Sequence, residues 1–395
     1  AKQVRNEPLP YPEKAMIAGP VGVIPRELPG LTCACVDIEL SARPQPRRGL
    51  RKTASSDTTD RLLEELMATP ANTIAAWRGS KRLELGWRSQ ALAEPQAAPF
   101  RSNGHYMITG GYGGIGLTIA GHLMQAHGAK VTLISRDGLP PRDSWDRYLS
   151  SHSPANRTAR RIRAVMALEA AQGGRVLPLA ADVCNSGQLL AARQQAEAEN
   201  GPLTGVIHAA GVIDDGPLLA KDEDALSRVL APKVSGLRAL DTVFPDGSLE
   251  VMLLFSSSST ATRPAGQVDY IAANEYLNAW ARHRAGGQRR VVAVDWGVWA
   301  DTGMAAGAIE ARTAAAGASP CRERAATTSR SGSAPKIFRS RFPRRRPNPV
   351  STSTSSRFVR MRSGAADRVM RFSSSDGRSE SHMTLGTTPN IAPPS

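Results

Sequence analysis

The chain has 395 residues and a net charge of +15, which is long enough for two or three domains. Sixteen Lys and Arg but only five Asp and Glu lie from position 307 onward, so +11 of the charge belongs to the tail and +4 to residues 1–306. The body is therefore nearly neutral, and a charge argument for nucleic-acid binding applies only to the tail.

No segment predicts a secretory signal or a membrane span. The start, AKQVRNEPLP, lacks an apolar run, and no apolar stretch approaches the roughly 20 residues that cross a bilayer. The cysteines have no His or second Cys pair nearby at zinc-ligand spacing. We therefore expect a cytoplasmic protein with reduced cysteines and no metal site. The chain does not begin with Met, which favours a fragment of a longer protein.

The first hundred residues predict a small α/β unit. Residues 31–40 alternate as a strand, residues 58–68 carry a helix start signal, and residues 73–87 predict two strands around the turn at 78–80. The segment has no glycine fingerprint and no acid/base constellation. We assign residues 1–103 to a structural, non-catalytic subdomain.

From position 105 the pattern changes to strands that alternate with helices. Strands are predicted at 106–111, 130–136, 174–183, 203–211, 251–259 and 289–299, with helices at 115–127, 158–171, 186–198 and 270–283. Short apolar strands separated by helices indicate a parallel sheet covered on both faces. Residues 104–306 are therefore expected to form a Rossmann-like, doubly wound α/β domain.

The last segment, residues 307–395, predicts a disordered tail. It contains one leucine and no Trp or Tyr, and it is rich in Arg, Ser, Thr, Pro and Ala. Such a segment cannot bury enough apolar area to offset the entropy lost on ordering. The composition resembles out-of-frame translation of a GC-rich gene, or an artificial end.

A glycine-rich motif, TGGYGGIG, follows the first predicted strand of this domain and opens a helix. Glycines allow the backbone to turn tightly and to approach a pyrophosphate, and the helix N-terminus presents free N–H groups. In this strand–turn–helix context the motif predicts dinucleotide binding rather than a plain turn. The residues concerned are Thr109, Gly110, Gly111, Tyr112, Gly113, Gly114, Ile115 and Gly116.

The end of the second strand favours NADPH over NADH. Selectivity for NAD needs a carboxylate there to hold the ribose 2′-OH, whereas this strand ends in Ser135 and Arg136. An arginine suits a 2′-phosphate. A solvated surface arginine is the alternative, and the neighbouring Asp137 weakens the prediction.

Residues 105–305 resemble the ketoreductase domain of a modular or iterative type I polyketide synthase, a branch of the short-chain dehydrogenase/reductase superfamily. The motifs TGGYGGIG, ADV, HAAGVIDDGPL, APKVSGLRAL, LLFSSSST, GQVDYIAANEYLNAW and VDWGVWADTGMA follow the family in order. The first hundred residues resemble its truncated Rossmann-like structural subdomain, above all in GPVGVIPRELPGLTC. The resemblance extends the cofactor site to Asp182, Val183, His208, Ala209, Ala210 and Gly211, with His208 in a structural role rather than as a base.

The resemblance also explains a missing lysine. Short-chain reductases often carry Tyr and Lys four residues apart on one helix, but Tyr270 is followed by Asn274. In the polyketide branch the lysine comes from an earlier helix, which implies Lys233 in PKVSG. The register of the family places Ser257 in the site, and Ser258 is the alternative.

Each of these side chains suits ketone reduction. Tyr270 would protonate the developing alkoxide, and an ammonium at Lys233 would favour its ionised form and could hold the nicotinamide ribose. Ser257 would orient the substrate carbonyl, and Asn274 could anchor a water that returns the proton. Tyr276 competes with Tyr270 but lies about 200° around the helix from Asn274. The alternative is that Lys233 is an ordinary solvent-exposed lysine without a catalytic role.

Ile213, Asp214 and Asp215 match the Leu-Asp-Asp fingerprint of the B-type family members, and Thr262 stands where the other class has Trp. By resemblance the product is a D-configured β-hydroxyl; an acidic loop that only aids solubility is the alternative. The family continues with a lid helix and a last sheet strand, which we do not find after about position 307. Activity could therefore be poor.

The expected reaction is reduction by NADPH of a β-ketoacyl thioester held on the phosphopantetheine arm of an acyl carrier protein, within a synthase of several domains. A freestanding short-chain reductase is one rival, and a catalytically silent structural fragment is another. A nucleic-acid-binding basic tail is a third, although the tail offers no folded platform for its four phenylalanines. We expect no nucleic-acid and no membrane partner.

Overall fold

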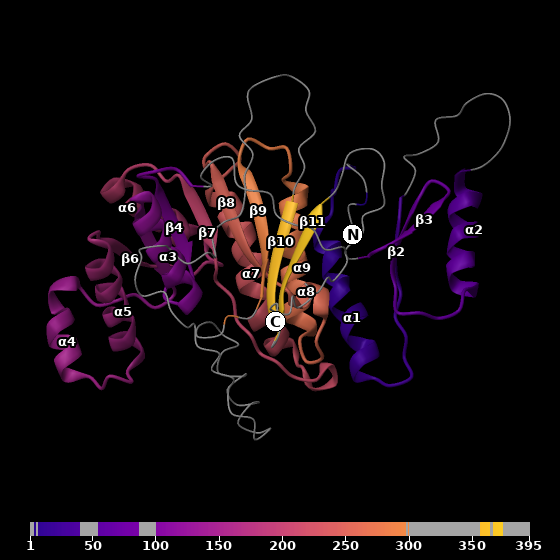
Figure 1. The fold of residues 1–395 in the computed structure, drawn as a ribbon, viewed down its shortest axis with the longest axis horizontal. Coiled ribbons are helices and arrows are strands. Elements are labelled where there is room, and N and C mark those ends of the chain that lie inside the picture. Colours follow the sequence, from indigo (N-terminus) through magenta and orange to yellow (C-terminus); the bar gives the residue numbers. More distant parts are fainter. Residues whose placement is uncertain are drawn as a thin grey trace, which may run out of the picture.

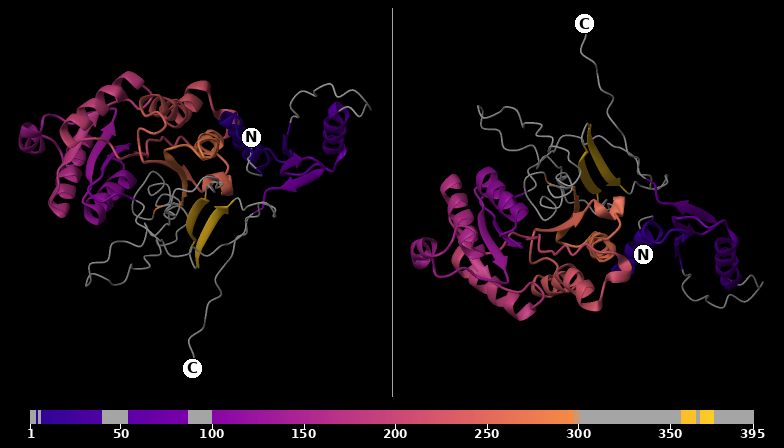
Figure 2. Two further views of the ribbon diagram at one scale, coloured as in Figure 1. Left: turned by 90° about the horizontal axis from the view of Figure 1, so that it is seen from above. Right: turned by 90° about the horizontal axis from the view of Figure 1, so that it is seen from below.

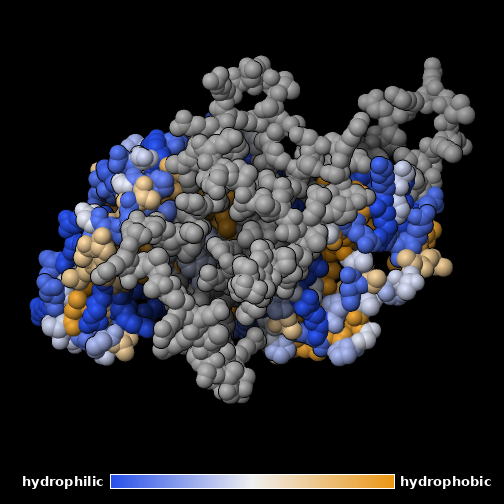
Figure 3. Space-filling model, in the orientation of Figure 1, coloured by the Kyte–Doolittle hydropathy of each residue, from blue (hydrophilic) through white to orange (hydrophobic). Residues whose placement is uncertain are grey.

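The computed structural model describes residues 4, 7–39, 54–86, 100–297, 299, 356–363 and 366–373. They form a large α/β unit and a small unit of three strands and one helix, with a hairpin from the C-terminal region beside them (Figure 1). In the part of the chain described, no helix is long and apolar enough to cross a membrane. The surface over α4 (Trp145–Ser151) and α5 (Arg157–Gln172) is mostly hydrophilic (Figure 3).

The large unit is built on a six-stranded sheet in the order β6-β5-β4-β7-β8-β9, and every neighbouring pair is parallel. This confirms the predicted doubly wound, Rossmann-like fold. The strand order reverses between β4 and β7, and in such sheets ligands bind outside the carboxyl ends of the strands at this point. The strands are β4 (His105–Thr109), β5 (Lys130–Ser135), β6 (Val176–Ala180), β7 (Gly205–His208), β8 (Val251–Ser257) and β9 (Arg290–Trp296).

Helices cover both faces of the sheet (Figure 2). Met107 of β4 points into a core shared with one set of helices, whereas Tyr106 and Ile108 point into a second core on the other face. This division follows from the alternation of side chains along a strand. The first face carries α6 (Ser186–Asn200), α7 (Glu223–Val243) and α9 (Val268–His283); the second carries α3 (Gly114–His127), α4 and α5. Short helices η2 (Arg142–Ser144), η3 (Leu218–Ala220) and α8 (Ser259–Thr262) lie in the connections.

The small unit confirms the elements expected for the first hundred residues. Strand β1 (Cys35–Ile38) pairs in parallel with β2 (Ile74–Arg78), which pairs antiparallel with β3 (Lys81–Glu84). Helix α2 (Ala54–Met67) lies beside this sheet (Figure 1). Both predicted strands around the turn at 78–80 are present.

Two helical segments near the N-terminus, η1 (Pro12–Ile17) and α1 (Ala18–Glu27), pack along α9. The sequence did not predict α1, because it contains two glycines and two prolines, which are poor helix formers. Gly19 explains part of this composition: a Cβ there would lie 2.3 Å from the carbonyl oxygen of Val268. The helix therefore approaches α9 more closely than any larger residue allows.

The C-terminal region departs from the prediction of a tail without regular structure. Strands β10 (Ser356–Ser363) and β11 (Ala366–Ser373) form an antiparallel hairpin that lies beside β9 without joining its ladder. Both segments combine arginines with Phe, Val and Met, and Phe and Val favour strands, so each segment forms a strand although the region as a whole is of low hydrophobicity. The rest of 307–395 lies outside the described residues.

Candidate functional site

The glycine-rich turn connects the carboxyl end of β4 to α3. Gly110 has a φ of +67°, and a Cβ there would lie 2.8 Å from the backbone of Ala210, so only glycine fits. A Cβ at Gly116 would lie 2.9 Å from the carbonyl oxygen of Gly110. Gly113 is the N-cap of α3 and makes no side-chain cap hydrogen bond. The first N–H groups of α3 are therefore available to an anion such as a pyrophosphate.

The remaining residues of the motif complete this turn. The predicted members Thr109, Gly111, Tyr112, Gly114 and Ile115 lie in the last position of β4, in the turn or in the first turn of α3. A Cβ at Gly111 would lie 2.8 Å from the Leu133 side chain. Burial raises the pKa of Tyr112, whose hydroxyl has no hydrogen-bond partner among the described residues.

The end of strand β7 lies beside the glycine-rich turn. Nδ1 of His208 and Oγ1 of Thr109 share a hydrogen bond of 2.8 Å, and the Ala210 N–H donates to the same Oγ1 at 3.4 Å. The Ala209 N–H donates to the Thr109 carbonyl oxygen, and Gly211 follows directly. His208 is fully buried, and burial and then the charge of Lys233 lower its pKa to about 3. A neutral, buried ring that holds two strand ends together suits a structural role.

The ends of β5 and β6 lie side by side. The Ala181 N–H donates to the Ser135 carbonyl oxygen at 3.0 Å. Oδ1 of Asp182 accepts from the Cys184 N–H at 2.9 Å, and Val183 between them is buried. Arg136, which follows directly after β5, is exposed at these strand ends.

The neighbouring carboxylate, Asp137, is engaged elsewhere. Its Oδ2 lies 3.2 Å from a guanidinium nitrogen of Arg157 and 3.3 Å from one of Arg161, both on α5. The surface around Arg136 at the carboxyl end of β5 therefore carries more positive than negative charge. Asp137 is paired with Arg157 and Arg161, so it argues less strongly against a bound phosphate at this position.

Four predicted catalytic side chains converge at the carboxyl end of β8. Ser257 is its last residue, Tyr270 and Asn274 lie one turn apart on α9, and Lys233 lies on α7. Nζ of Lys233 is 5.9 Å from the centre of the Tyr270 ring and donates to the carbonyl oxygen of Phe255 at 2.7 Å. Lys233 is only 3% exposed, which excludes the surface alternative.

The pKa of Tyr270 is raised, chiefly by burial and also by the charge of Asp215, whereas hydrogen bonds with the side chains of Ser257 and Asn274 lower it. The pKa of Tyr270 is thus shifted in the direction opposite to the one expected from a neighbouring ammonium at Lys233. Burial lowers the pKa of Lys233 itself to about 7, and its Nζ is directed to a backbone carbonyl. Tyr270 is therefore held as a protonated phenol, the form that can give up a proton.

Asn274 is fully buried at the centre of the site. Its Nδ2 donates to the Tyr270 carbonyl oxygen at 2.7 Å, and its Oδ1 has no hydrogen-bond partner among the described residues. A buried acceptor without a partner can be satisfied by a water. The competing Tyr276 is 2% exposed and packs in the core formed with α6 and α7.

The loop that contains Asp214 and Asp215 lies against the start of α9. Oδ2 of Asp215 accepts from Nε2 of Gln267 at 3.0 Å, and the Gly216 N–H donates to the Gly266 carbonyl oxygen at 3.0 Å. Asp214 forms an exposed ion pair with Arg228. Asp214 and Asp215 therefore lie beside the turn at Gly266 and Gln267 that precedes Tyr270.

The sequence analysis missed three residues, Lys221, Asp269 and Glu27, whose hydrogen bonds fix the loop at 214–218 and the turn before Tyr270. Nζ of Lys221 lies 2.5 Å from Oδ2 of Asp269, both side chains are almost fully buried, and Nζ also donates to the Asp214 carbonyl oxygen. From α1, the carboxylate of Glu27 accepts from the N–H groups of Leu218 at 2.6 Å and Gly266 at 2.5 Å. No local pattern marks any of the three.

Comparison with known proteins gives a consistent result. The family model described as the KR domain matches residues 104–301. The 6-methylsalicylic acid synthase of Aspergillus terreus is 39% identical over 210 residues, 52% of this chain and 11% of that protein. A phenolphthiocerol/phthiocerol polyketide synthase chain of Mycobacterium tuberculosis H37Rv is 36% identical over 255 residues, 62% of this chain and 13% of that protein. The chain thus spans only a small part of these relatives.

Solved structures agree with these sequence matches. A ketoreductase domain from the bacillaene assembly line superposes with a TM-score of 0.60 at 25% identity, over 79% of this chain and 69% of that one. A structure of A-type ketoreductases from a modular polyketide synthase gives a TM-score of 0.56 at 28% identity, over 74% of this chain and 56% of that one.

Proposed function

Because the chain belongs to the family of ketoreductase domains found in polyketide synthases, we propose that it reduces a β-ketoacyl thioester to the β-hydroxyacyl thioester with NADPH. The observation that carries the proposal is the convergence of Ser257, Tyr270 and Lys233 at the sheet edge that also carries the glycine-rich turn. Its relatives are multidomain synthases, so we propose that the substrate arrives on the phosphopantetheine arm of an acyl carrier protein.

The residues of the glycine-rich turn suit a dinucleotide. A tight, glycine-rich turn, the free N–H groups of α3 and an exposed arginine after β5 fit a pyrophosphate and a 2′-phosphate. When bound, NADPH would supply the hydride, which is chemistry that protein side chains lack.

The side chains of the chain itself would handle the carbonyl and the proton. The Ser257 hydroxyl would donate a hydrogen bond to the substrate carbonyl oxygen and orient it. Tyr270 would give its proton to that oxygen as negative charge develops there. The raised pKa keeps this proton in place until the oxygen becomes basic. An ammonium at Lys233 would stabilise the resulting phenolate, and a water on Oδ1 of Asn274 would return the proton.

The decisive experiment follows NADPH oxidation by absorbance with a short β-ketoacyl thioester. We expect Tyr270→Phe to lower kcat by about 100-fold or more, the size of a lost general acid. Tyr276→Phe is the matched control, because this tyrosine lies on the same helix but in the core. Equal activity of Tyr270→Phe and the unaltered protein would contradict the assignment.

NADPH selectivity is tested by Arg136→Gln. We expect kcat/KM for NADPH to fall about tenfold or more, since a charge-assisted hydrogen bond to phosphate is lost. The value for NADH should stay unchanged, and Arg160→Gln provides an exposed arginine as control. An equal loss with both cofactors would argue against a 2′-phosphate contact.

For stereochemistry we propose a D-configured β-hydroxyl, on the strength of the motif at 213–215. The contact between Asp215 and Gln267 supports a role for this loop beside Tyr270. Chiral analysis of the product tests the assignment, and an L-hydroxy product would overturn it.

A catalytically silent fragment is the second candidate. It is favoured by one observation: among the described strands the main sheet ends at β9, and the hairpin β10–β11 does not extend it. Tight binding of NADPH without turnover of any β-ketoacyl thioester would support this candidate.

A further inference from the structure

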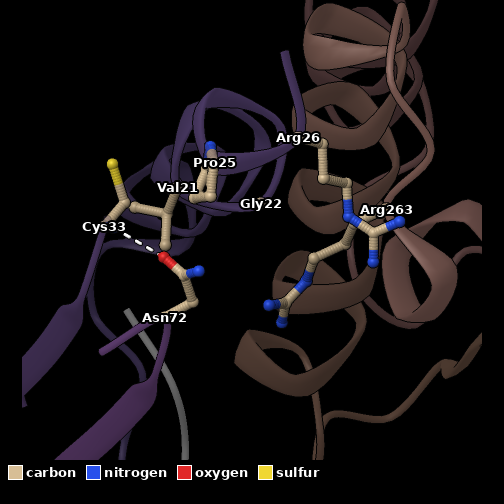
Figure 4. Close-up of a pocket in the computed structure, with 7 residues that line it drawn as sticks. All are labelled: Val21, Gly22, Pro25, Arg26, Cys33, Asn72 and Arg263. Atoms are coloured by element: carbon tan, nitrogen blue, oxygen red, sulfur yellow. Dashed lines mark hydrogen bonds between the residues drawn. The ribbon is translucent and has the colours of Figure 1, made fainter. Parts of the chain in front are cut away.

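A pocket lies away from the residues assigned to the reaction. It has a volume of about 210 Å³ and opens between α1, the small sheet and the turn that follows α8. This is smaller than the roughly 300–1,000 Å³ of pockets that hold drug-sized ligands, so it suits a small ligand rather than an acyl chain or a dinucleotide. Its walls are Val21, Gly22, Pro25, Arg26, Cys33, Asn72 and Arg263 (Figure 4).

The lining of this pocket is positively charged. Among the described residues that line it are two arginines and no acidic side chain, and Figure 4 shows Arg26 and Arg263 next to each other, opposite Cys33 and Asn72. Burial lowers the pKa of Arg263, the charge of Glu275 opposes this effect, and the charge of Arg26 adds to it. Two guanidinium groups brought together in this way repel each other unless an anion lies between them.

Arg263 is held at this position against local preference. It is one of two non-glycine residues with a positive φ, +46°, among those described, and its Nε is buried without a hydrogen-bond partner among them. Backbone in the left-handed region favours glycine, and such residues cluster at functional sites. Helix α1 leaves room for the side chain: a Cβ at Gly22 would lie 2.4 Å from Cδ of Arg263.

The remaining polar side chain also offers a donor. Oδ1 of Asn72 accepts from the Cys33 N–H at 2.9 Å, which leaves Nδ2 of Asn72 available to a ligand. The pocket thus combines an amide N–H₂ with two guanidinium groups and presents no carboxylate. Guanidinium groups match the oxygens of a phosphate in both geometry and charge.

We propose that this pocket binds a small phosphate, with Arg26, Arg263 and Asn72 as its donors. The ligand is either free phosphate or the phosphate group of a small monoester. Its binding would connect α1 to the turn that precedes α9. The proposal does not depend on ketone reduction, because it concerns none of the residues assigned to the cofactor or the reaction.

The test is titration with inorganic phosphate by calorimetry, together with the melting temperature in phosphate and in chloride at equal ionic strength. The measurements use protein that carries Arg136→Gln, which removes the arginine after β5. The N–H groups of α3 can also bind phosphate, so the response of the pocket is the part that an Arg263 variant removes. We expect a higher melting temperature in phosphate. Arg263→Gln should weaken binding by about tenfold or more, whereas the exposed control Arg160→Gln should not change it.

Arg263→Gly keeps the test valid if the glutamine variant folds poorly. Glycine accepts the positive φ, so we expect this variant to melt at a higher temperature than its parent without phosphate and to lose the response to phosphate. Absence of binding to the parent, or equal binding to Arg263→Gly, would overturn the proposal, as would binding of acetate but not of phosphate. Glycerol phosphate separates the sources: affinity equal to that of phosphate supports a monoester, and weaker affinity supports the free ion.

Discussion

Glu27 and Gly266 are 239 positions apart in the sequence, and the carboxylate of Glu27 accepts a hydrogen bond of 2.5 Å from the Gly266 N–H. Its second oxygen accepts from the Leu218 N–H at 2.6 Å. One side chain of α1 therefore holds both the loop after Asp215 and the turn before Tyr270. Helix α1 therefore contributes directly to the shape of the proposed catalytic site.

The first prediction concerns this contact. Glu27→Gln replaces one acceptor oxygen by an N–H₂ group that faces an N–H donor, so we expect a loss of about 1–3 kcal/mol in the free energy of unfolding. Because the loops beside Tyr270 lose a fixed position, kcat/KM should fall about tenfold. Urea unfolding and steady-state kinetics measure the two effects. Glu250→Gln, which removes only an exposed ion pair with Arg101, should change neither by a comparable amount.

The second prediction concerns the buried pair of Lys221 and Asp269, with side chains 4% and 2% exposed. Asp269→Asn or Lys221→Met alone leaves a buried charge without its partner and should cost about 3–5 kcal/mol. The double variant should lose clearly less than the sum of the two. A double-mutant cycle from urea unfolding measures the coupling. The exposed pair of Arg101 and Glu250 is the control, with an expected coupling of about 1 kcal/mol or less. Additive losses at Lys221 and Asp269 would refute the coupling.

The third prediction follows from Lys233, whose pKa is lowered to about 7 by burial. In the unfolded chain a lysine titrates near pH ~10.4, so between about pH 7 and pH 10 the unfolded state binds one more proton than the folded state. This group therefore makes the free energy of unfolding rise with pH across that window, by at most about 1.4 kcal/mol per pH unit, and contributes no slope below it.

Lys233→Met isolates this contribution, because other groups titrate equally in both proteins. We expect the stability of the unaltered protein to rise more steeply from pH 7 to pH 9 than that of the variant, as measured by urea unfolding. Parallel pH profiles would mean that Lys233 keeps its ordinary pKa in the folded protein.

The fourth prediction separates backbone strain from steric overlap at two glycines. Gly110 and Gly173 have nearly equal φ values of +67° and +65°, but a Cβ at Gly173 meets nothing within 4 Å, whereas one at Gly110 meets the backbone of Ala210 at 2.8 Å. Gly173→Ala should cost about 1 kcal/mol in stability. Gly110→Ala should cost several times more and should also abolish NADPH binding, which thermal unfolding and fluorescence titration measure. Equal costs would show that the overlap with Ala210 is relieved by a small shift.

The sequence predicts the central sheet and the helices α3, α5, α6 and α9 well because each strand is a short apolar run and these helices are periodic. It does not predict α7 from a local pattern, because Pro232 lies inside this helix. It identifies Tyr270, Asn274, Ser257 and Lys233 through motifs, and the structure brings all four together. It does not reveal the raised pKa of Tyr270, because burial is a property of the assembled fold.

Other features depend on contacts between distant segments or on local exceptions. Helix α1 carries glycines and prolines because it must approach α9, whereas its composition alone predicts a loop. Glu27 has no recognisable motif, since its partners are backbone N–H groups far along the chain. The strands β10 and β11 arise from two short runs with Phe, Val and Met inside a segment of low hydrophobicity.

The family match begins at residue 104, but the packed core begins earlier in the sequence, because η1 and α1 pack on α9. Val23 of α1 shares a core with Val268 and Ile271 of α9, and Ala15 of η1 packs against Ala279. A protein cut to begin at residue 104, where the family match starts, would expose this side of the helix that carries Tyr270 and would lose Glu27. A protein truncated to this ketoreductase domain should therefore begin upstream of η1.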